Sequence, residues 1–243
     1  MQHREDRFTV RAFDCLPNGG IKLNALMQYL QEAAARHAEQ IGFGFADLDR
    51  QGCFWILSNL RIELAALPRW RDDVTIRTWP SGFTRATASR EFIGEDPDGR
   101  EIFRAASEWM VLDKHSGRPR NVTRLGVSLP ADGPKAFSAE LRRLQPLDGY
   151  TEACTLLAPF SALDFNGHVN NTEYVRWALD GLSVQLGHPP QIRAAQVTYL
   201  AEAFQGDEIK VLVSPRTDDR VSILERKSRG PDRADVCLLE IAC

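Results

Sequence analysis

The chain of 243 residues states one pattern of secondary structure twice, and this repeat restricts its fold more than any other feature. Apolar residues recur at steps of three and four over residues 23–41 and again over 175–186, which predicts two helices that each bury one face. Asn170 with Glu173 resembles a helix-opening cap, and Gly187 predicts the end of the second helix. Each predicted helix follows a turn rich in Gly and Asn.

Strand-like segments rich in Val, Ile, Thr, Phe and Trp follow each predicted helix. The segments are 53–65, 73–79, 86–94 and 102–113 in the first half, and 193–204, 208–215, 219–227 and 235–242 in the second. The predicted order is therefore strand, helix and then a run of strands, stated twice. One long helix wrapped by an antiparallel sheet of this order is the hotdog arrangement. The predicted fold class is α+β, a tandem (double) hotdog.

The repeat also predicts the domain organisation. We expect residues 1–125 to form the N-terminal hotdog and 151–243 to form the C-terminal hotdog. Residues 126–150 contain three prolines and three glycines, and they read as a linker with one short helix. Single hotdogs usually pair and build their active sites across the pair, so a chain with two hotdogs can form that pair within itself. Association into a homodimer is left open.

Composition restricts the class of function. The chain is 43% hydrophobic and 26% charged, which is typical of a globular protein with enough apolar material for a core. Its net charge of -3 gives no bulk electrostatic argument for binding nucleic acid. The five cysteines are scattered without a CxxC or a zinc-type spacing with histidine, so we expect reduced thiols, no metal site and no cofactor. No GxGxxG, GxxxxGK[ST] or GxSxG motif occurs.

The N-terminal sequence MQHREDRFTV has no apolar segment typical of a signal peptide, and no apolar run of about 18 residues predicts a membrane span. Either the protein acts in the cytosol where it is made, or a leader precedes this sequence. We expect a cytoplasmic protein.

The stretch LDFNGHVNN at 163–171 concentrates hydrogen-bonding side chains. Asp164, Asn166 and His168 alternate, so an extended backbone would project them to the same side. A histidine can accept or donate a proton near neutral pH, and a carboxylate can fix its tautomer. The structural alternative is an Asx-rich turn that the histidine caps.

The predicted opening of the second helix adds a further candidate group. Val169, Asn170 and Asn171 stand where backbone N–H groups have no partner within the helix. Such amides can bind a developing oxyanion, and they are candidate substrate-binding groups.

Comparison of the two halves favours chemistry over a structural role for this stretch. Aligning helix to helix sets Leu16, Asn18, Gly20 and Ile21 against Asp164, Asn166, His168 and Val169. The first half keeps the turn but lacks the aspartate and the histidine, so the turn does not require them.

A second acid lies in "VTYLAEAFQGDEIKV", which reads as strand, turn and strand. We expect Glu202 in the first of these strands among apolar residues, where a carboxylate is unfavourable without a partner. The same hairpin of the first half places Leu67 opposite Glu202, so the charge is again absent there. The alternative is a solvent-facing glutamate at a sheet edge.

These residues carry a resemblance to a known family. The first half contains "LMQYLQEAAARHAEQIGFG", "FWILSNLRIELAALPRWRDDVTIRTWPSG" and "RAASEWMVLDKHSGRPRNV", and the second contains "DFNGHVNNTEYVRWALD" and "VTYLAEAFQGD". The chain resembles the acyl-acyl carrier protein thioesterases, the plant plastid enzymes and their bacterial relatives, which are double hotdogs. The NxHVNNxxY core, with Trp three residues later, is the specific part of this resemblance.

The resemblance implies hydrolysis of acyl-acyl carrier protein thioesters, which releases free fatty acid in fatty acid biosynthesis. It implies catalytic roles for Asp164, Asn166, His168 and Glu202. Water activation by Glu202 and His168, or by Asp164 with their help, is the expected mechanism, and direct attack by a carboxylate stays open. The plant enzymes commonly have a cysteine after this glutamate, whereas Ala203 stands here, which excludes a cysteine nucleophile at that position. The absence of a transit leader fits a bacterial version.

The resemblance also implies roles for the first half, whose own site is degenerate. Its helix and sheet are expected to line an acyl-chain pocket, with Met27, Leu30 and Trp55 as candidate lining residues. Carrier protein is acidic, so docking is expected to draw on Arg61, Arg69, Arg71, Arg77, Arg85 and Arg90. An acyl-CoA thioesterase, a hotdog hydratase and a non-catalytic acyl-binding module remain as alternatives.

Overall fold

The computed structural model describes residues 3–125, 133–230 and 232–243. The chain divides into two compact units, Met1–Leu141 and Arg142–Cys243, and each has its own long helix and antiparallel sheet. In the part of the chain that the structure describes, no helix is long and apolar enough to cross a membrane.

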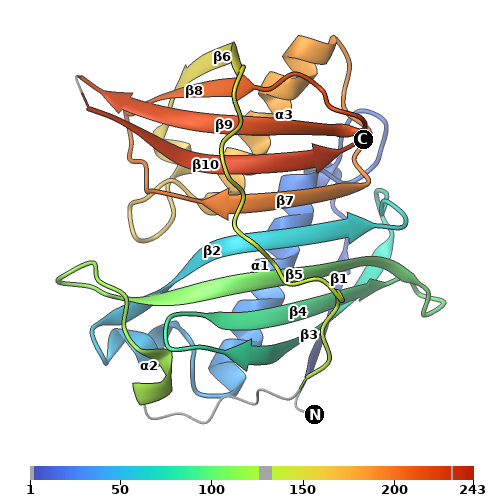
Figure 1. The fold of residues 1–243 in the computed structure, drawn as a ribbon. Coiled ribbons are helices and arrows are strands. Elements are labelled where there is room, and N and C mark those ends of the chain that lie inside the picture. The colour runs from blue at the N-terminus through green and yellow to red at the C-terminus, as the bar shows by residue number, and fades with distance from the viewer. Residues whose placement is uncertain (1–2, 126–132, 231) are drawn as a thin grey trace. The chain divides into compact units, whose positions relative to one another are not determined.

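In the described part of the first unit, the strands follow the order β1-β3-β4-β5-β2. The strands are β1 (Arg4–Thr9), β2 (Cys53–Leu64), β3 (Asp73–Phe83), β4 (Ala88–Glu95) and β5 (Glu101–Asp113). The helices are α1 (Leu23–Gln40) and α2 (Phe45–Asp49), with short 3-10 helices at Ala12–Asp14 and Val122–Arg124. The long helix α1 lies across one face of this sheet (Figure 1) and buries Leu26, Leu30 and Ala33.

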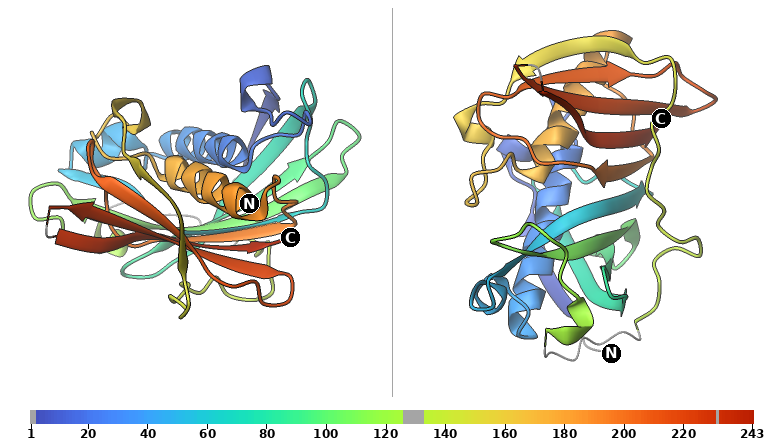
Figure 2. Two further views of the ribbon diagram at one scale, coloured as in Figure 1. Left: turned by 90° about the horizontal axis from the view of Figure 1, so that it is seen from above. Right: turned by 60° about the vertical axis from the view of Figure 1, so that its left-hand side comes forward.

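The described part of the second unit repeats this plan with the strand order β7-β10-β9-β8-β6. The strands are β6 (Thr151–Leu157), β7 (Ala194–Tyr199), β8 (Glu208–Val213), β9 (Arg220–Arg229) and β10 (Asp232–Ala242), and a 3-10 helix covers Phe160–Ala162. Its long helix, α3 (Asn171–Leu186), lies against one face of its own sheet (Figure 2). A Cβ at Gly181 would lie 2.6 Å from Cγ1 of Val211, so glycine lets α3 approach the sheet closely.

Both predicted long helices are confirmed, and so is the order of elements around them. Asn170 is the N-cap of α3, since its side-chain oxygen accepts the N–H of Thr172 at 3.0 Å. Gly187 ends the helix with a φ of 75°, a backbone conformation that glycine adopts without strain. The short helix α2 was not predicted. It begins where the N–H of Gly44 donates to the carboxylate of Asp47 at 3.0 Å, a local cap rather than a periodic apolar face.

The end of strand β7 and the linker bear on two of the expectations. Strand β7 ends at Tyr199, so the expected strand 193–204 is too long and Glu202 lies in the loop that follows. The N–H groups of Leu200 and Ala201 both donate to the carbonyl of Val236, so two residues of this chain segment face one residue of β10. The regular pairing, and with it the strand, ends there. Part of the expected linker, residues 126–132, lies outside the described residues, and the described residues 133–150 contain no helix.

Candidate active site

The residues from Asp164 to His168 form a tight turn rather than the expected extended segment. The N–H of Asp164 donates to the carbonyl of His168 at 2.8 Å, and the N–H of Gly167 donates to the carbonyl of Asp164 at 3.0 Å. Gly167 has a φ of 80°, which this turn requires at its fourth position. The three polar side chains therefore share one turn, not one face of a strand.

The carboxylate of Asp164 holds this turn from inside. One of its oxygens accepts the N–H of Asn166 at 2.8 Å and that of His168 at 3.2 Å. In the first unit the matching amide, that of Gly20, donates instead to the side chain of Asn18 at 3.0 Å. In the second unit Asp164 therefore replaces the asparagine as the acceptor, which leaves the side-chain amide of Asn166 free of this task.

His168 meets Glu202, the second acid that the sequence singled out. Nδ1 of His168 lies 3.4 Å from Oε1 of Glu202, and the two side chains are 27% and 45% exposed, so solvent and substrate can reach both. On its other side the imidazole lies edge-on to the ring of Phe204, with the ring centroids 5.1 Å apart at 88°. The carboxylate and the aromatic ring together restrict the orientation of the imidazole.

The loop that carries Glu202 is bonded to the turn through the backbone. The N–H of Val169 donates to the carbonyl of Ala203 at 2.9 Å, and the N–H of Asn170 donates to the carbonyl of Ala162 at 2.8 Å. Both amides are thus used within the fold, which argues against the predicted oxyanion role for these two. The carbonyl of Asn171 accepts the hydroxyl of Tyr199 at 3.1 Å.

The first unit contains the same backbone arrangement without the ionisable pair. The N–H of Ile21 donates to the carbonyl of Pro68 at 2.8 Å, as that of Val169 does to Ala203. A Cβ at Gly20 would lie 2.8 Å from Cδ2 of Leu67, which places Leu67 where Glu202 lies in the second unit. These matches confirm the alignment of the two halves. The first unit therefore has the turn and the loop but no acid and no base at this place.

The candidate acyl-pocket residues lie in the interior of the first unit. Met27 and Leu30 are fully buried on α1. Trp55 is half-buried on β2, and its indole N–H donates to the carbonyl of Phe43 at 2.9 Å. Because the Trp55 ring also packs on Phe43 in a small apolar cluster, its contacts are those of a structural residue.

The set of arginines expected to dock carrier protein needs one correction. Arg90 is buried, and its guanidinium lies 3.0 Å from Nδ1 of the buried His37 and 3.2 Å from the hydroxyl of Thr78, so it cannot meet a partner. Burial lowers the pKa of Arg90 to about 10. Burial, and then the charge of Arg90, lower the pKa of His37 to about 4, so this histidine is neutral. The buried His37 therefore packs inside the first unit.

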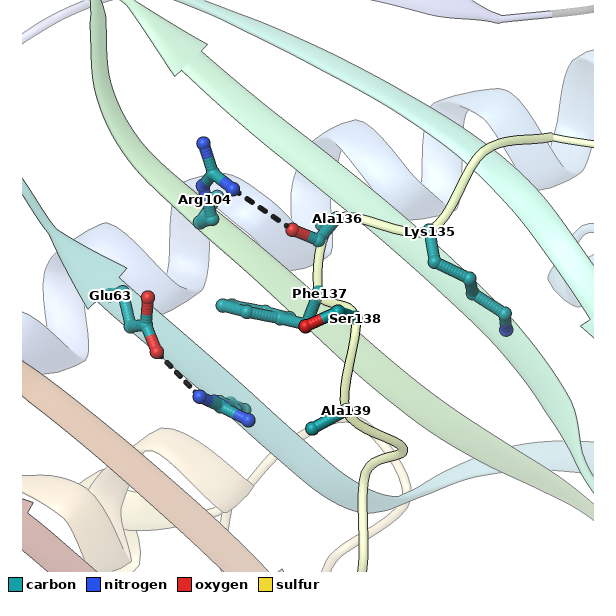
Figure 3. Close-up of a pocket in the computed structure, with 8 residues that line it drawn as sticks. Glu63, Arg104, Lys135, Ala136, Phe137, Ser138 and Ala139 are labelled. Atoms are coloured by element: carbon teal, nitrogen blue, oxygen red, sulfur yellow. Dashed lines mark hydrogen bonds and ion pairs between the residues drawn. The ribbon is translucent and has the colours of Figure 1, made fainter.

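A separate pocket of about 550 Å³ lies on the first unit (Figure 3). It is lined by Arg61, Glu63, Arg104 and residues 135–139. Its cations already have partners, since Arg61 pairs with Glu63 and Arg104 donates to the carbonyl of Ala136 at 3.2 Å. None of the predicted catalytic or acyl-pocket residues lines it.

The sequence comparison missed two residues of the site, Tyr174 and Phe204. Tyr174 is part of the quoted NxHVNNxxY core, so the signal was present, but nothing in its spacing gave it a role. Phe204 lies two residues after Glu202 in an apolar-looking segment, and only the folded loop brings it to His168.

Two family models of known proteins match most of this chain. The family model of the acyl-ACP thioesterase N-terminal domain matches residues 2–125, and that of the C-terminal domain matches residues 152–233. The oleoyl-acyl carrier protein thioesterase 2, chloroplastic, of Arabidopsis thaliana is 28% identical over 235 residues, which are 89% of this chain and 64% of the relative. The corresponding protein of Coriandrum sativum is 26% identical over 90% of this chain and 64% of its own length. The chain thus spans less than two thirds of these relatives.

Solved structures extend the likeness to the fold. The crystal structure of an acyl-ACP thioesterase from Bacteroides thetaiotaomicron has a TM-score of 0.87 and 27% identity, covering 99% of this chain and 97% of that one. The 12:0-ACP thioesterase from Umbellularia californica has a TM-score of 0.82 at 20% identity, covering 99% of this chain and 96% of that one, and so shows the same fold. The predicted double hotdog is confirmed. This chain belongs to the acyl-ACP thioesterase family.

Proposed function

We propose that this protein hydrolyses acyl-acyl carrier protein and releases free fatty acid, with its one active site in the second unit. The observation that carries the proposal is the 3.4 Å approach of His168 Nδ1 to Glu202, at a place where the first unit has glycine and leucine. A base oriented by a carboxylate is the arrangement that activates water. Family membership supports a thioester as the substrate.

In this mechanism a water molecule adds to the thioester carbonyl carbon as it gives a proton to Nε2 of His168. Glu202, beside Nδ1, orients the ring and stabilises the imidazolium that forms. The tetrahedral intermediate then expels the thiolate, the C–S bond breaks, and the imidazolium returns the proton to sulfur. The products are a free acid and the carrier thiol, and the imidazole is neutral again.

The oxyanion needs a hydrogen-bond donor. Since the amides of Val169 and Asn170 are bonded within the fold, we assign this task to the side-chain amide of Asn166, which Asp164 frees by holding the turn. An exposed amide on a rigid turn is already placed before the charge develops. In the alternative in which Asp164 takes part in activating water, its second carboxylate oxygen holds the water molecule.

A carboxylate that attacks the carbonyl directly, and so forms a transient anhydride, is the competing route. A single turnover in oxygen-18 water detects the anhydride route when the anhydride is opened at the enzyme carboxyl. Water attack puts one heavy oxygen into the first fatty acid released. An anhydride that is opened at the enzyme carboxyl releases a first fatty acid without label.

For the acyl chain we propose room beneath α1 in the first unit, with Met27 and Leu30 as lining residues. The buried apolar face that these two residues share supports this proposal. We propose that the protein acts in the cytoplasm of a bacterium, and its likeness to nearly the full length of the Bacteroides thetaiotaomicron chain supports this.

The test is hydrolysis of acyl carrier protein and coenzyme A thioesters of graded chain length by the wild type, Glu202→Gln and His168→Gln. Losing a placed acid or base typically costs about 10²–10⁴ in rate, so kcat should fall by that factor in both variants. Leu67→Gln, at the matching position of the first unit, is the control and should stay active. The site assignment fails if the two variants match the wild type. The proposed reaction fails if the wild type cleaves no thioester.

A further inference from the structure

A buried tyrosine of α3 supports the loop that carries Glu202. The hydroxyl of Tyr174 accepts the N–H of Ala203, the residue after Glu202, at 3.0 Å. The carbonyl of Ala203 accepts the N–H of Val169 at 2.9 Å. Both Ala203 and Tyr174 are buried. The two backbone groups beside Glu202 are therefore bonded, one to the catalytic turn and the other to the tyrosine hydroxyl.

The first unit shows that the fold does not need this hydrogen bond. Tyr174 lies five residues after Val169, and the residue five positions after Ile21 is Leu26, which has no hydroxyl. The counterpart of Ala203 is Pro68, which has no N–H to satisfy. Donor and acceptor are thus both present in the unit with the ionisable pair and both absent in the other.

The sheet beneath α3 also has polar residues where the sheet beneath α1 has apolar ones. Tyr199, Cys237 and Glu225 lie side by side across β7, β10 and β9. The matching row of the first unit is Leu64, Phe103 and Gly94. The rings of Tyr174 and Tyr199 are 6.2 Å apart, so Tyr174 adjoins this polar row. An apolar row in one unit is replaced by a polar row behind the catalytic loop in the other.

The surroundings keep the Tyr174 hydroxyl neutral. Burial raises the pKa of Tyr174 well above its ordinary value, and the neighbouring Cys237 and Glu225 act in the same direction. A neutral phenol accepts a backbone N–H without placing a charge behind the site. A buried N–H that loses its acceptor is costly, so the loop would shift to find another.

We propose that Tyr174 is a positioning residue of the active site, which fixes Glu202 against His168 by holding the N–H of Ala203. The proposal rests on the proposed roles of Glu202 and His168. Tyr174 does not touch the reacting atoms. It acts by limiting how far the loop can move.

The first test is Tyr174→Phe, which removes only the hydroxyl. We expect kcat on acyl carrier protein thioesters to fall about 10-fold or more, with little change in KM, because a loosened Glu202 orients His168 less well and so slows the chemical step rather than binding. The control is Tyr150→Phe in the same unit. The hydroxyl of Tyr150 also accepts a backbone N–H, that of Leu147 at 3.3 Å. It pairs as well with the hydroxyl of Ser222, which lies in β9 rather than in the loop that carries Glu202. This control should keep the kcat of the wild type.

A double-mutant cycle separates positioning from general stability. In the Glu202→Gln background the tyrosine hydroxyl has no carboxylate to position against His168, so Tyr174→Phe should lower the residual kcat no further. If it lowers kcat by the same factor in both backgrounds, the tyrosine acts through stability and the proposal is wrong. It is also wrong if Tyr174→Phe has the kcat of the wild type.

A second variant approaches the same hydrogen bond from its donor. Ala203→Pro copies the residue that the first unit has in this loop and removes the N–H. It should lower kcat as Tyr174→Phe does, and adding Tyr174→Phe to it should change nothing more. Multiplying losses would contradict the proposal. If Tyr174→Phe folds poorly, Ala203→Pro alone still tests it, and a wild-type kcat in that variant would contradict it. A wild type without thioester hydrolysis, or an active Glu202→Gln, would instead overturn the proposed function and site.

Discussion

The buried carboxyl of Glu225 predicts how the stability of this protein depends on pH. Glu225 lies fully buried in β9, and within the described part of the chain neither of its carboxyl oxygens has a hydrogen-bond partner. Burial raises its pKa well above the ordinary value, so the folded protein keeps this proton after the unfolded chain has lost it. The folded state then binds more protons than the unfolded state, and stability falls as pH rises.

The size of the effect follows from linkage. The window opens near the unfolded pKa of about 4.3 and closes at the raised folded pKa. Within it the free energy of unfolding falls by up to about 1.4 kcal/mol per pH unit for this one proton. Glu225→Gln keeps the shape and removes the titration. Relative to the wild type, the variant should therefore gain stability as pH increases from 5 to 8, roughly linearly inside the window.

Urea unfolding of both proteins at each pH unit measures this difference directly. The control is Glu152→Gln on β6, because hydrogen bonds from Lys210 and Thr155 lower the pKa of that exposed carboxylate. Its difference from the wild type should not grow with pH in this range. A difference between Glu225→Gln and the wild type that is independent of pH would refute the reasoning, because it would mean that Glu225 is ionised in the folded protein.

The remaining predictions concern the core and the turn that carries Asp164 and His168. His37→Gln should reduce the loss of stability as pH falls from about 6.5 to 4, because the folded pKa of about 4 means that the unfolded chain gains the proton first. Urea unfolding across that range checks this prediction. An unchanged dependence of the free energy of unfolding on pH would contradict it. Gly181→Ala should destabilise by about 1–3 kcal/mol through the clash with Val211, and Val211→Ala should relieve part of that loss; two independent, additive losses in thermal unfolding would argue against the clash. Asp164→Ala should lower kcat about 10- to 100-fold and let Asn166 turn back to the His168 amide, as Asn18 does with Gly20. Adding Asn166→Ala should then cost little more, and multiplying losses would show that Asn166 still acts without the aspartate.

Much of the fold was predictable because the two halves of the chain repeat one pattern and can be aligned with each other. The apolar period gave both long helices, and aligning them paired Gly20 with His168 and Leu67 with Glu202 before any contact was known. The same backbone hydrogen bonds in both units explain why that alignment holds. The position of Glu202 in a strand was wrong because apolar residues continue past Tyr199, and the strand ends only where the N–H groups of Leu200 and Ala201 share the carbonyl of Val236.

Other parts of the site depend on contacts that no local pattern encodes. The amides of Val169 and Asn170 look unbonded from their helix position, but their acceptors lie at Ala203 and Ala162, outside the helix. The role of Asp164 in holding the turn was equally hidden, because the first half builds the same turn with Asn18 instead. Arg90 was expected at the surface because the sequence of a single strand does not show which of its side chains lie on the sheet face that α1 covers.

The turn of the first unit, which has glycine and leucine in place of the ionisable pair, has a consequence for how such a chain can evolve. Gly20→His alone would press a new side chain against Leu67, and Leu67→Glu alone would expose a carboxylate beside a glycine with no imidazole to orient. Neither change is useful before the other, so the two positions are epistatic. A half without this pair therefore does not gain it by single useful steps, and selection is free to shape that half for a different task.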